Sequence, residues 1–242
     1  MSATPHTYDP KVLIVIPTYN EAENITPITT AVLEAAPSVH ILIVDDSSPD
    51  GTGDIADKLS AERSEIHVLH RTSKDGLGRA YLAGFQWALD RDYQVVFEMD
   101  ADFSHDPAYL LTMIRATQDY DLIIGSRYVE GGGTEDWGVA RQFISQGGGL
   151  YARTVLGVGI RDLTAGFMAW RREVLEAIDF SNVDASGYGF QIEMKYRASR
   201  MGFRILEIPI HFPDRQVGES KMSSKIFMEA MGLVWKLRLK DI

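Results

Sequence analysis

The sequence predicts an α/β protein whose mostly parallel sheet is covered by helices on both faces. Two observations lead to this prediction. Short runs rich in β-branched residues alternate with helix-compatible segments through the first half of the chain, and a polar or glycine-rich segment follows each run. Such alternation is typical of β-α-β units, whose strands run parallel. Because ligands of these folds collect at the carboxyl ends of the strands, the polar segments are expected to share one functional edge.

Five strands are expected in this first half, each a short apolar run: Val12–Ile16, Ile41–Val44, Ile66–Leu69, Val95–Phe97 and Leu122–Ile124. The helix-compatible segments between them are Ala22–Ala36, Thr52–Ala61, Leu77–Leu89 and Pro107–Thr117. Proline is favoured in the first turn of a helix, and Asp106 precedes it as a capping residue. The polar segments that separate strands from helices are therefore expected to be loops.

The alternation changes after about residue 131. Gly131–Gly133 and Gly147–Gly149 bracket a segment in which Trp137, Arg141 and Ser145 recur at helical spacing. This pattern predicts a mobile loop that leads into a short helix. Later elements are expected to be a helix that opens at Gly187, a strand over Arg204–Ile210 and a helix over Ser224–Lys240.

Composition excludes several classes of protein. The chain has 242 residues, no cysteine and a formal net charge of −10. Without cysteine, disulfides and thiolate chemistry are unavailable, which suits a reducing cytosol. The acidic balance argues against nonspecific binding of nucleic acid. The last 28 residues are basic, with a formal charge of +3, so the acidity lies in the rest of the chain. Because the body of the protein is acidic, we expect a metal ion and individual arginines to bind an anionic substrate.

Asp100 and Asp102 are the most informative pair in the chain. They follow the apolar run that ends at Met99, and at i and i+2 they project to the same side of an extended segment. A divalent cation relieves the repulsion between two such carboxylates, and Mg²⁺ or Mn²⁺ prefers their oxygens together with substrate phosphates. A turn that caps the next helix would explain an aspartate here, but Asp106 can serve that purpose alone.

A wider set of motifs resembles, in order along the chain, the dolichol (polyprenol) phosphate mannose synthases, which are family-two inverting glycosyltransferases. The motifs are Val15-Ile-Pro-Thr-Tyr-Asn-Glu, Val44-Asp-Asp-Ser-Ser-Pro-Asp-Gly-Thr, Gly76-Leu-Gly, Met99-Asp-Ala-Asp-Phe-Ser-His, Gly125-Ser-Arg-Tyr-Val, Thr164-Ala-Gly-Phe, Gly187-Tyr-Gly-Phe-Gln and Gly218-Glu-Ser-Lys. The resemblance covers roughly residues 11–225. It implies a Rossmann-like nucleotide-sugar fold of the GT-A type and transfer of mannose from GDP-mannose to a polyprenyl monophosphate.

The resemblance also assigns residues to the donor site. Tyr19 offers a ring and Glu21 an acceptor to the nucleoside, while Asp46 can accept from base or ribose. Asp102 is the strongest candidate metal ligand, Asp100 binds directly or through water, and Ser104 stands at the third family position, where serine reaches less far than glutamine. The nucleotide-sugar set implied by the resemblance is Pro17, Tyr19, Glu21, Asp46, Gly76, Asp100, Ala101, Asp102 and Arg215.

The acceptor needs positive charge more than it needs a base. A phosphomonoester has a second pKa near ~6, so it is mostly dianionic at neutral pH. Arg127, Arg141, Ser145 and Lys221 are the candidates for holding this phosphate, and Arg127 is also the candidate catalytic residue beside Asp102. Ordinary ion pairs with nearby carboxylates are the alternative for these arginines. Gln191 and Glu193 could contact the substrate or simply belong to a packed helix.

The lipid acceptor raises the question of how the chain meets a membrane. No apolar run approaches the ~20 residues that span a bilayer. We expect an N-terminal tail over residues 1–10, a catalytic domain over 11–225 and an amphipathic C-terminal helix over 226–242. This helix would contact a membrane surface or a separate integral membrane partner, or pack on its own core. Peripheral association with the cytosolic face of the membrane is the expected location.

Three rival functions remain open from the sequence. The same fold and acceptor could serve UDP-glucose or another nucleotide sugar. A sugar-1-phosphate nucleotidyltransferase also binds nucleotide and Mg²⁺, but it typically has a glycine-rich motif with Arg and Lys after the first strand, which is absent here. A non-catalytic scaffold is disfavoured by the intact Asp100, Asp102 and Arg127.

The segment that begins at Gly76 does not match the dinucleotide-binding fingerprint, because Tyr81 stands where the third glycine of that motif belongs.

Overall fold

The computed structural model is built around one seven-stranded sheet, and it describes residues 8–134, 139–183, 187–213 and 224–239. The strand order is β3-β2-β1-β4-β7-β5-β8. All neighbouring strands pair in parallel except β7, which runs antiparallel to both β4 and β5. The strands of this sheet are β1 (Val12–Thr18), β2 (His40–Asp45), β3 (Ile66–His70), β4 (Val95–Glu98), β5 (Leu122–Ser126), β7 (Met168–Arg171) and β8 (Ile205–Pro209).

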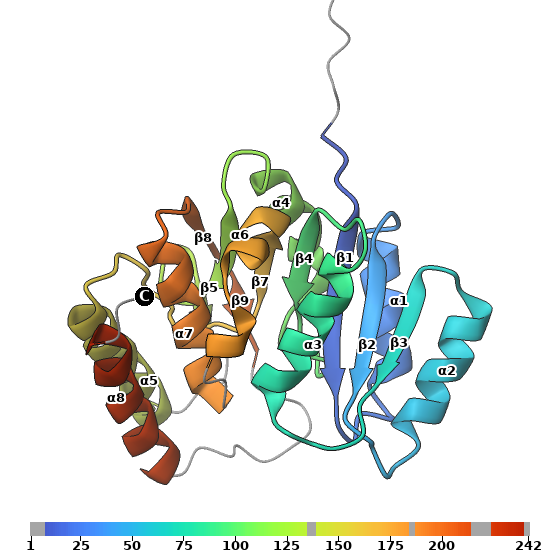
Figure 1. Cartoon of the computed structure of the whole chain (residues 1–242), viewed down its shortest axis with the longest axis horizontal. Coiled ribbons are helices and arrows are strands. Elements are labelled where there is room, and N and C mark those ends of the chain that lie inside the picture. Colours follow the sequence, from blue (N-terminus) through green and yellow to red (C-terminus); the bar gives the residue numbers. More distant parts are fainter. Residues whose placement is uncertain (1–7, 135–138, 184–186, 214–223, 240–242) are drawn as a thin grey trace, which may run out of the picture.

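Helices cover both faces of the sheet (Figure 1). The face seen in Figure 1 carries α3, α6, α7 and the pair α5 and α8, while α1, α2 and α4 belong to the other side. A small parallel pair, β6 (Gly133–Thr134) and β9 (His211–Phe212), lies outside the main sheet. The helices are α1 (Ile25–Ala35), α2 (Thr52–Glu62), α3 (Leu77–Leu89), α4 (Leu110–Ala116), α5 (Val139–Leu156), α6 (Arg172–Ala177), α7 (Gly187–Arg200) and α8 (Ser224–Leu239), with 3-10 turns at Pro107–Tyr109 and Phe180–Asn182.

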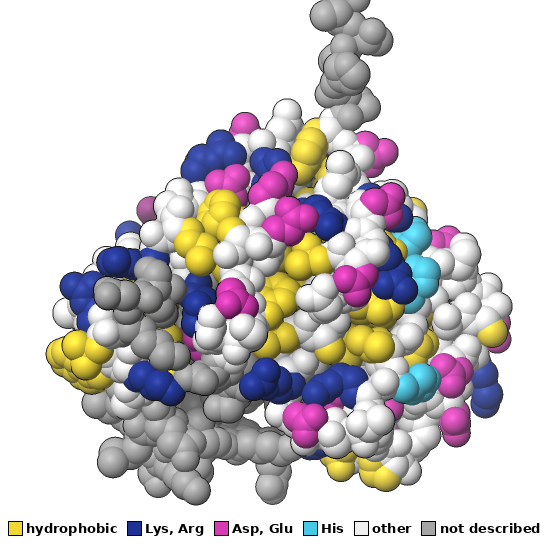
Figure 2. Space-filling model, viewed as in Figure 1, with side chains coloured by type: hydrophobic (Ala, Val, Ile, Leu, Met, Phe, Trp, Pro, Cys, Tyr) yellow, Lys and Arg dark blue, Asp and Glu magenta, His cyan; other side chains and the backbone are white. Residues whose placement is uncertain are grey.

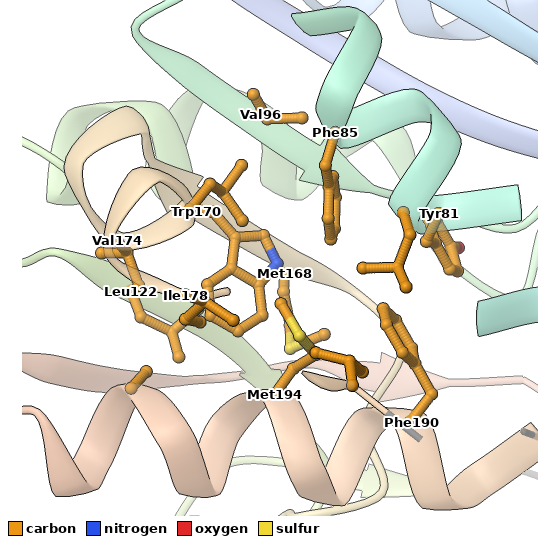
Figure 3. Packing of buried hydrophobic residues seen from close by; sticks show 14 of the residues in the cluster. Tyr81, Phe85, Val96, Leu122, Met168, Trp170, Val174, Ile178, Phe190 and Met194 are labelled. Carbon is orange, nitrogen blue, oxygen red and sulfur yellow. The ribbon is translucent and has the colours of Figure 1, made fainter. Parts of the chain in front are cut away.

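Aromatic packing joins the two halves of the sheet (Figure 3). The Tyr81 and Phe190 rings, from α3 and α7, stack with centroids 6.0 Å apart. Phe85 lies edge-on to Trp170 of β7, at 6.4 Å. α3 approaches β1 so closely that a Cβ on Gly84 would lie 2.5 Å from the Val15 side chain, so only glycine fits there. This contact fixes the start of α3 beside the carboxyl ends of the strands.

The five strands and four helices expected for the first half are confirmed, with ends shifted by a few residues. Pro107 begins a 3-10 turn that continues into α4, and the Asp106 side chain caps it by accepting a hydrogen bond from the Ala108 N–H. The late strand is present as β8. β7, over Met168–Arg171, is not predicted from the sequence, because a four-residue run that is mostly buried carries no alternation that identifies it.

The helix predicted before Gly147–Gly149 is present, but the prediction that it is short is wrong. α5 is 18 residues long and runs through the three glycines to Leu156. Gly149, Ala152 and Leu156 are buried along one face of this helix, and the last two join the core beneath it. Tertiary packing of this face overrides the low helix propensity of glycine.

The C-terminal helix packs on the rest of the chain. Val234 and Leu237 of α8 are buried in the same core as α5 and α7. Trp235 and Leu239 instead leave 52% and 80% of their surface exposed. Within the described ranges, no helix combines the length and apolarity needed to cross a bilayer. The domain boundary at residue 225 remains a prediction.

Candidate active site

The loops that follow β1, β2, β3 and β4 meet at one edge of the sheet, because these four strands are parallel neighbours. We call this edge the nucleotide rim. The structure thereby brings together the following predicted residues: Pro17, Tyr19, Glu21, Asp46, Gly76, Asp100, Ala101, Asp102 and Ser104. Arg127 follows β5, which is parallel to them and separated from β4 by β7 alone.

Strained backbone is concentrated on this rim. The three non-glycine residues with positive φ among the described residues are Asn20, Ser47 and Phe103, and they lie in the loops after β1, β2 and β4. Gly76 has φ +98° immediately before α3, a conformation that side chains disfavour. Such conformations each cost about 1–3 kcal/mol and cluster at functional sites. Their concentration at this edge favours a binding site there.

Buried polar contacts hold the first two loops in place. The Thr18 hydroxyl donates to Asp45 Oδ1 at 3.1 Å, and the Ser48 hydroxyl donates to the same oxygen at 2.6 Å. Asp46 accepts from Arg71 Nη1 at 2.6 Å. Burial raises the pKa of Asp46, and the Arg71 charge offsets this only in part. Asp46, predicted to accept from a base or ribose, thus already has a cationic partner.

The predicted nucleoside contacts also have protein neighbours. The Tyr19 ring is 36% exposed, and Lys74 Nζ lies 3.4 Å from its centroid. Glu21 accepts from the Asn24 side chain at 2.8 Å, while its backbone N–H donates to the Thr52 hydroxyl at 2.9 Å. The ring and carboxylate therefore sit on a loop tied to the start of α2.

The metal motif is formed by the segment after β4. Asp100 and Asp102 are both half-buried. Asp100 Oδ1 accepts from the Tyr81 hydroxyl at 3.3 Å, and Asp102 Oδ1 accepts from the Ser104 N–H at 3.1 Å. Burial, together with the Asp100 charge, raises the pKa of Tyr81 well above its ordinary value, so this phenol remains a donor. His105 Nδ1 accepts from the Asp100 N–H at 2.9 Å and shapes the turn.

These residues fit a hard divalent cation. The donor set consists of carboxylate oxygens, which Mg²⁺ and Mn²⁺ prefer. The Ser104 hydroxyl is buried and has no hydrogen-bond partner among the described residues, an unsatisfied oxygen of the kind that a bound ion or its water accounts for. Among the described residues, no three His, Cys, Asp or Glu side chains converge on one point. A cation here would need further ligands from a substrate.

Arg127 is held by a buried carboxylate. Its Nε and Nη2 donate to the two oxygens of Asp162 at 2.8 and 2.7 Å, and Nη2 also donates to Thr164 Oγ1. Burial alone would raise the pKa of Asp162, but the Arg127 charge and hydrogen bonds hold it below its ordinary value. The ion pair that the sequence left as an alternative is present, and it fixes the orientation of Arg127.

Arg127 also lines a cavity of about 610 Å³ beside α5. Arg153 and Arg161 line it too, together with Leu150, whose side chain is 57% exposed. Neither Arg153 nor Arg161 has a side-chain ion pair with any described residue. We call this space the arginine cavity. Neither arginine belongs to a local motif, so no pattern in the sequence predicts that they line this space.

Four predicted residues cannot be placed by their side chains. Arg215 and Lys221 lie outside the described residues. Arg141 and Ser145 belong to α5, but their side chains are outside the described ones. Their proposed roles stay predictions.

A buried polar network supports the site from behind. Glu98, the last residue of β4, accepts from Trp170 Nε1 at 2.8 Å and from Gln191 Nε2 at 2.6 Å. Lys195 Nζ donates to the carbonyl oxygens of Leu163 and Ala165, at 3.1 and 2.6 Å. Burial raises the pKa of Glu98 to about 7 and lowers the pKa of Lys195 to about 8.

The same network involves the two residues of α7 that the sequence offered as substrate contacts or as parts of a packed helix. Gln191 is buried on Glu98, but its Oε1 has no hydrogen-bond partner among the described residues, and Glu193 is buried against Arg197 at 2.6 Å. Phe190 lies in the core, so α7 is a packed helix, while a substrate contact by Gln191 stays a prediction. Lys195 anchors the loop that carries Asp162 and Thr164, the two partners of Arg127.

Comparison with known proteins agrees with this arrangement. Residues 13–179 match the family model described as glycosyl transferase family 2. The undecaprenyl-phosphate mannosyltransferase of Micrococcus luteus is 51% identical over 222 residues, which cover 91% of this chain and 91% of the relative. The polyprenol monophosphomannose synthase of Mycolicibacterium smegmatis is 53% identical over 232 residues, which cover 94% and 88%.

Solved structures share the fold at low identity. Glucosyl-3-phosphoglycerate synthase from Mycobacterium tuberculosis, in complex with Mn²⁺, UDP and phosphoglyceric acid, superposes with a TM-score of 0.69 at 16% identity, over 96% of this chain and 80% of that one. The mannosyltransferase PcManGT from Pyrobaculum calidifontis, in complex with GDP-Man and Mn²⁺, gives 0.60 at 15% identity, over 96% and 71%.

Fold and rim together define a glycosyltransferase with a GT-A-type fold. The chain belongs to glycosyltransferase family 2.

Proposed function

We propose that this protein transfers mannose from GDP-mannose to a polyprenyl monophosphate with inversion, giving polyprenyl phosphate mannose and GDP. The observation that carries the proposal is the placement of two unlike groups of residues at the carboxyl ends of parallel strands in one sheet. The paired carboxylates of the nucleotide rim follow β4, and Arg127, which lines the arginine cavity, follows β5, two positions along the sheet. The names of the two relatives at 51% and 53% identity support the same acceptor and sugar.

The rim would hold the donor. Tyr19, Glu21 and Asp46 are proposed to contact the nucleoside, with Pro17, Gly76 and Ala101 approaching it through backbone. Asp102 and Asp100 would hold Mg²⁺ or Mn²⁺, with Ser104 as a third group. Such a cation, when bound, neutralises charge that develops on the leaving diphosphate.

The arginine cavity would hold the acceptor. Three arginines, Arg127, Arg153 and Arg161, line it, and a charge-assisted hydrogen bond to phosphate is worth about 1.5–3 kcal/mol. An acceptor phosphate oxygen forms the bond to the anomeric carbon, while the bond from that carbon to the diphosphate breaks and its electron pair leaves with GDP. No proton has to move, because the acceptor oxygen is already ionised at neutral pH. A general base is therefore unnecessary.

The lipid part of the acceptor would leave the cavity along α5 and α8. Leu150 lies on the cavity wall, and Trp235 and Leu239 expose apolar surface on α8 beside Lys236 and Arg238. Exposed aromatic and aliphatic side chains next to cations suit a membrane interface. We propose peripheral association with the cytosolic face of a membrane, either with lipid directly or through an integral membrane partner.

A transfer assay tests the proposal. Purified protein is given a short polyprenyl phosphate and radiolabelled GDP-mannose or UDP-glucose, with and without EDTA. Lipid-soluble label from GDP-mannose alone, lost with EDTA, is the expected result. Label from UDP-glucose alone would overturn the donor assignment, and label that persists in EDTA would overturn the metal requirement.

A further inference from the structure

A second cluster of donor atoms lies at the opposite end of the strands from the nucleotide rim. His40 is the first residue of β2 and His67 is the second residue of β3. His67 pairs with Leu42, so His40, two residues earlier on β2, projects to the same face as His67. Tyr93, two residues before β4, approaches both from across β1.

Three side-chain atoms converge at this point. His40 Nδ1 and His67 Nε2 are 3.0 Å apart. The Tyr93 hydroxyl lies 2.9 Å from the first nitrogen and 3.4 Å from the second. Each neutral imidazole carries one ring proton, so one ring can donate to the other, and the tautomer decides which nitrogen presents its lone pair.

The spacing suits a metal ion. Imidazole nitrogens bind late first-row divalent metals at about 2.0–2.1 Å, which places neighbouring ligands of one ion roughly 3 Å apart. The observed separations are 2.9, 3.0 and 3.4 Å. One ion with ligands from β2, from β3 and from the segment before β4 would crosslink this edge of the sheet.

The charge around the cluster permits a cation. Burial lowers the pKa of His40 and of His67, which keeps both imidazoles in the neutral form that ligates metals. Two cations, Lys11 and Arg91, lie near the cluster, over the rings of Tyr93 and Trp87 respectively. Glu65 and Asp92 also face it and balance them in formal charge.

The cluster is within reach of solvent. His40 and His67 are each half-buried, whereas Tyr93 is 2% exposed and forms the floor. Figure 2 shows histidine side chains at the surface near the amino-terminal ends of β2 and β3, beside Lys and Arg side chains. An ion can therefore enter from solvent without opening the sheet.

We propose that His40 and His67, with the hydroxyl of Tyr93, form a site for a late first-row divalent cation such as Zn²⁺, Cu²⁺ or Ni²⁺. The site is separate from the carboxylates of the nucleotide rim. Imidazole ligands favour these ions over Mg²⁺ and Mn²⁺, which prefer oxygen ligands, so the two sites select different metals. A bound ion would stabilise the β3-β2-β1 edge of the sheet without taking part in transfer.

The test uses Cu²⁺ as a spectroscopic probe on the untagged full chain, with excess Mg²⁺ and GDP present to occupy the rim. Electron paramagnetic resonance reports how many imidazole nitrogens ligate Cu²⁺, and calorimetry reports the affinity. We expect one Cu²⁺ per chain with two nitrogen ligands. His40→Gln and His67→Gln should each weaken binding at least tenfold, whereas His70→Asn, which changes an exposed histidine outside the cluster, should bind as wild type does.

A second readout is thermal stability with Zn²⁺. The melting temperature should rise for wild type and His70→Asn, and should not rise for His67→Gln. Two results would overturn the proposal: a wild-type spectrum without two nitrogen ligands, or equal Cu²⁺ affinity in wild type and His67→Gln. The wild-type spectrum decides even if a variant fails to fold.

Discussion

The two halves of the sheet place the charged groups of the candidate site differently. In the parallel half, β3-β2-β1-β4, the two carboxylates of the metal motif stand half-buried at the rim. In the mixed half, β7-β5-β8, Arg127 follows β5 and pairs with the fully buried Asp162. The carboxylates of the parallel half are therefore open to a ligand, whereas the buried carboxylate of the mixed half fixes the orientation of Arg127.

The largest expected effect is on stability and comes from removing Lys195, the buried cation behind the mixed half of the sheet. Lys195→Met would leave the carbonyls of Leu163 and Ala165 without their cationic donor and would remove the charge that offsets Glu98. We expect the free energy of unfolding to fall by about 3–5 kcal/mol. Arg200→Met, an exposed change on the same helix, is the control and should stay within about 0.5 kcal/mol in denaturant titrations. Equal stabilities for the two variants would contradict the role of Lys195.

The next largest effect is expected on the transfer rate, when a carboxylate of the metal motif in the parallel half is neutralised. Asp102→Asn should lower the rate of mannose transfer by about 100-fold or more, because a neutral amide is a poor ligand for Mg²⁺ or Mn²⁺. Its melting temperature should stay close to that of wild type. Asp106→Asn is the matched control, since its side-chain oxygen caps a helical turn and an amide oxygen can do the same. Comparable losses in both variants would show that Asp102 is not a ligand.

Neutralising the arginines of the arginine cavity tests whether the acceptor and the donor bind at different places. Arg153→Gln and Arg161→Gln should each raise the KM for a short polyprenyl phosphate about tenfold, since each removes one charge-assisted hydrogen bond. The Kd for GDP should not change. Arg115→Gln, on α4 and exposed, serves as the reference. A KM for Arg161→Gln that matches this reference would exclude the cavity as the phosphate site.

A smaller effect is expected at the membrane. Trp235→Ser and Leu239→Ser should each reduce sedimentation with anionic lipid vesicles by about tenfold at most, from the apolar area that each side chain can bury. Point changes are preferable to removing α8, because Val234 and Leu237 belong to the core. Leu111→Ser, an exposed leucine on α4, controls for general loss of apolar surface. Vesicle binding that is unchanged in both α8 variants would assign membrane contact to another surface.

The smallest expected effect is a pH dependence of stability, which arises from His40 and His67 at the edge of the parallel half. Burial holds the folded-state pKa values of His40 and His67 below the ordinary histidine value of 6.5, so the unfolded chain binds more protons in this range. The free energy of unfolding should therefore fall as the pH drops below about 6.5. The double change His40→Gln and His67→Gln should flatten this part of the curve in metal-free denaturant titrations. An unchanged slope would contradict the assigned titration.

The same contrast explains which parts of the molecule the sequence could predict. Alternating strands and helices, with polar residues at the strand ends, predict the first half and the rim around Asp100 and Asp102, because these features are local. β7 is four residues long, and α5 passes through three glycines, so their positions depend on packing that no local pattern records. Arg153 and Arg161 belong to no sequence motif, and only the fold shows that they line the same cavity as Arg127. Lys195, by type a surface residue, is completely buried.

The most direct measurement compares two acceptors that differ only in the phosphate. Wild-type protein with GDP-mannose and Mg²⁺ is offered a short polyprenyl phosphate or the corresponding polyprenol, and lipid-soluble mannose is counted. If the arginine cavity holds an ionised phosphate that attacks without a general base, mannose is transferred to the polyprenyl phosphate and not to the alcohol. Equal transfer to the polyprenol would contradict the account, because it would require a base and an acceptor site that this arrangement does not provide.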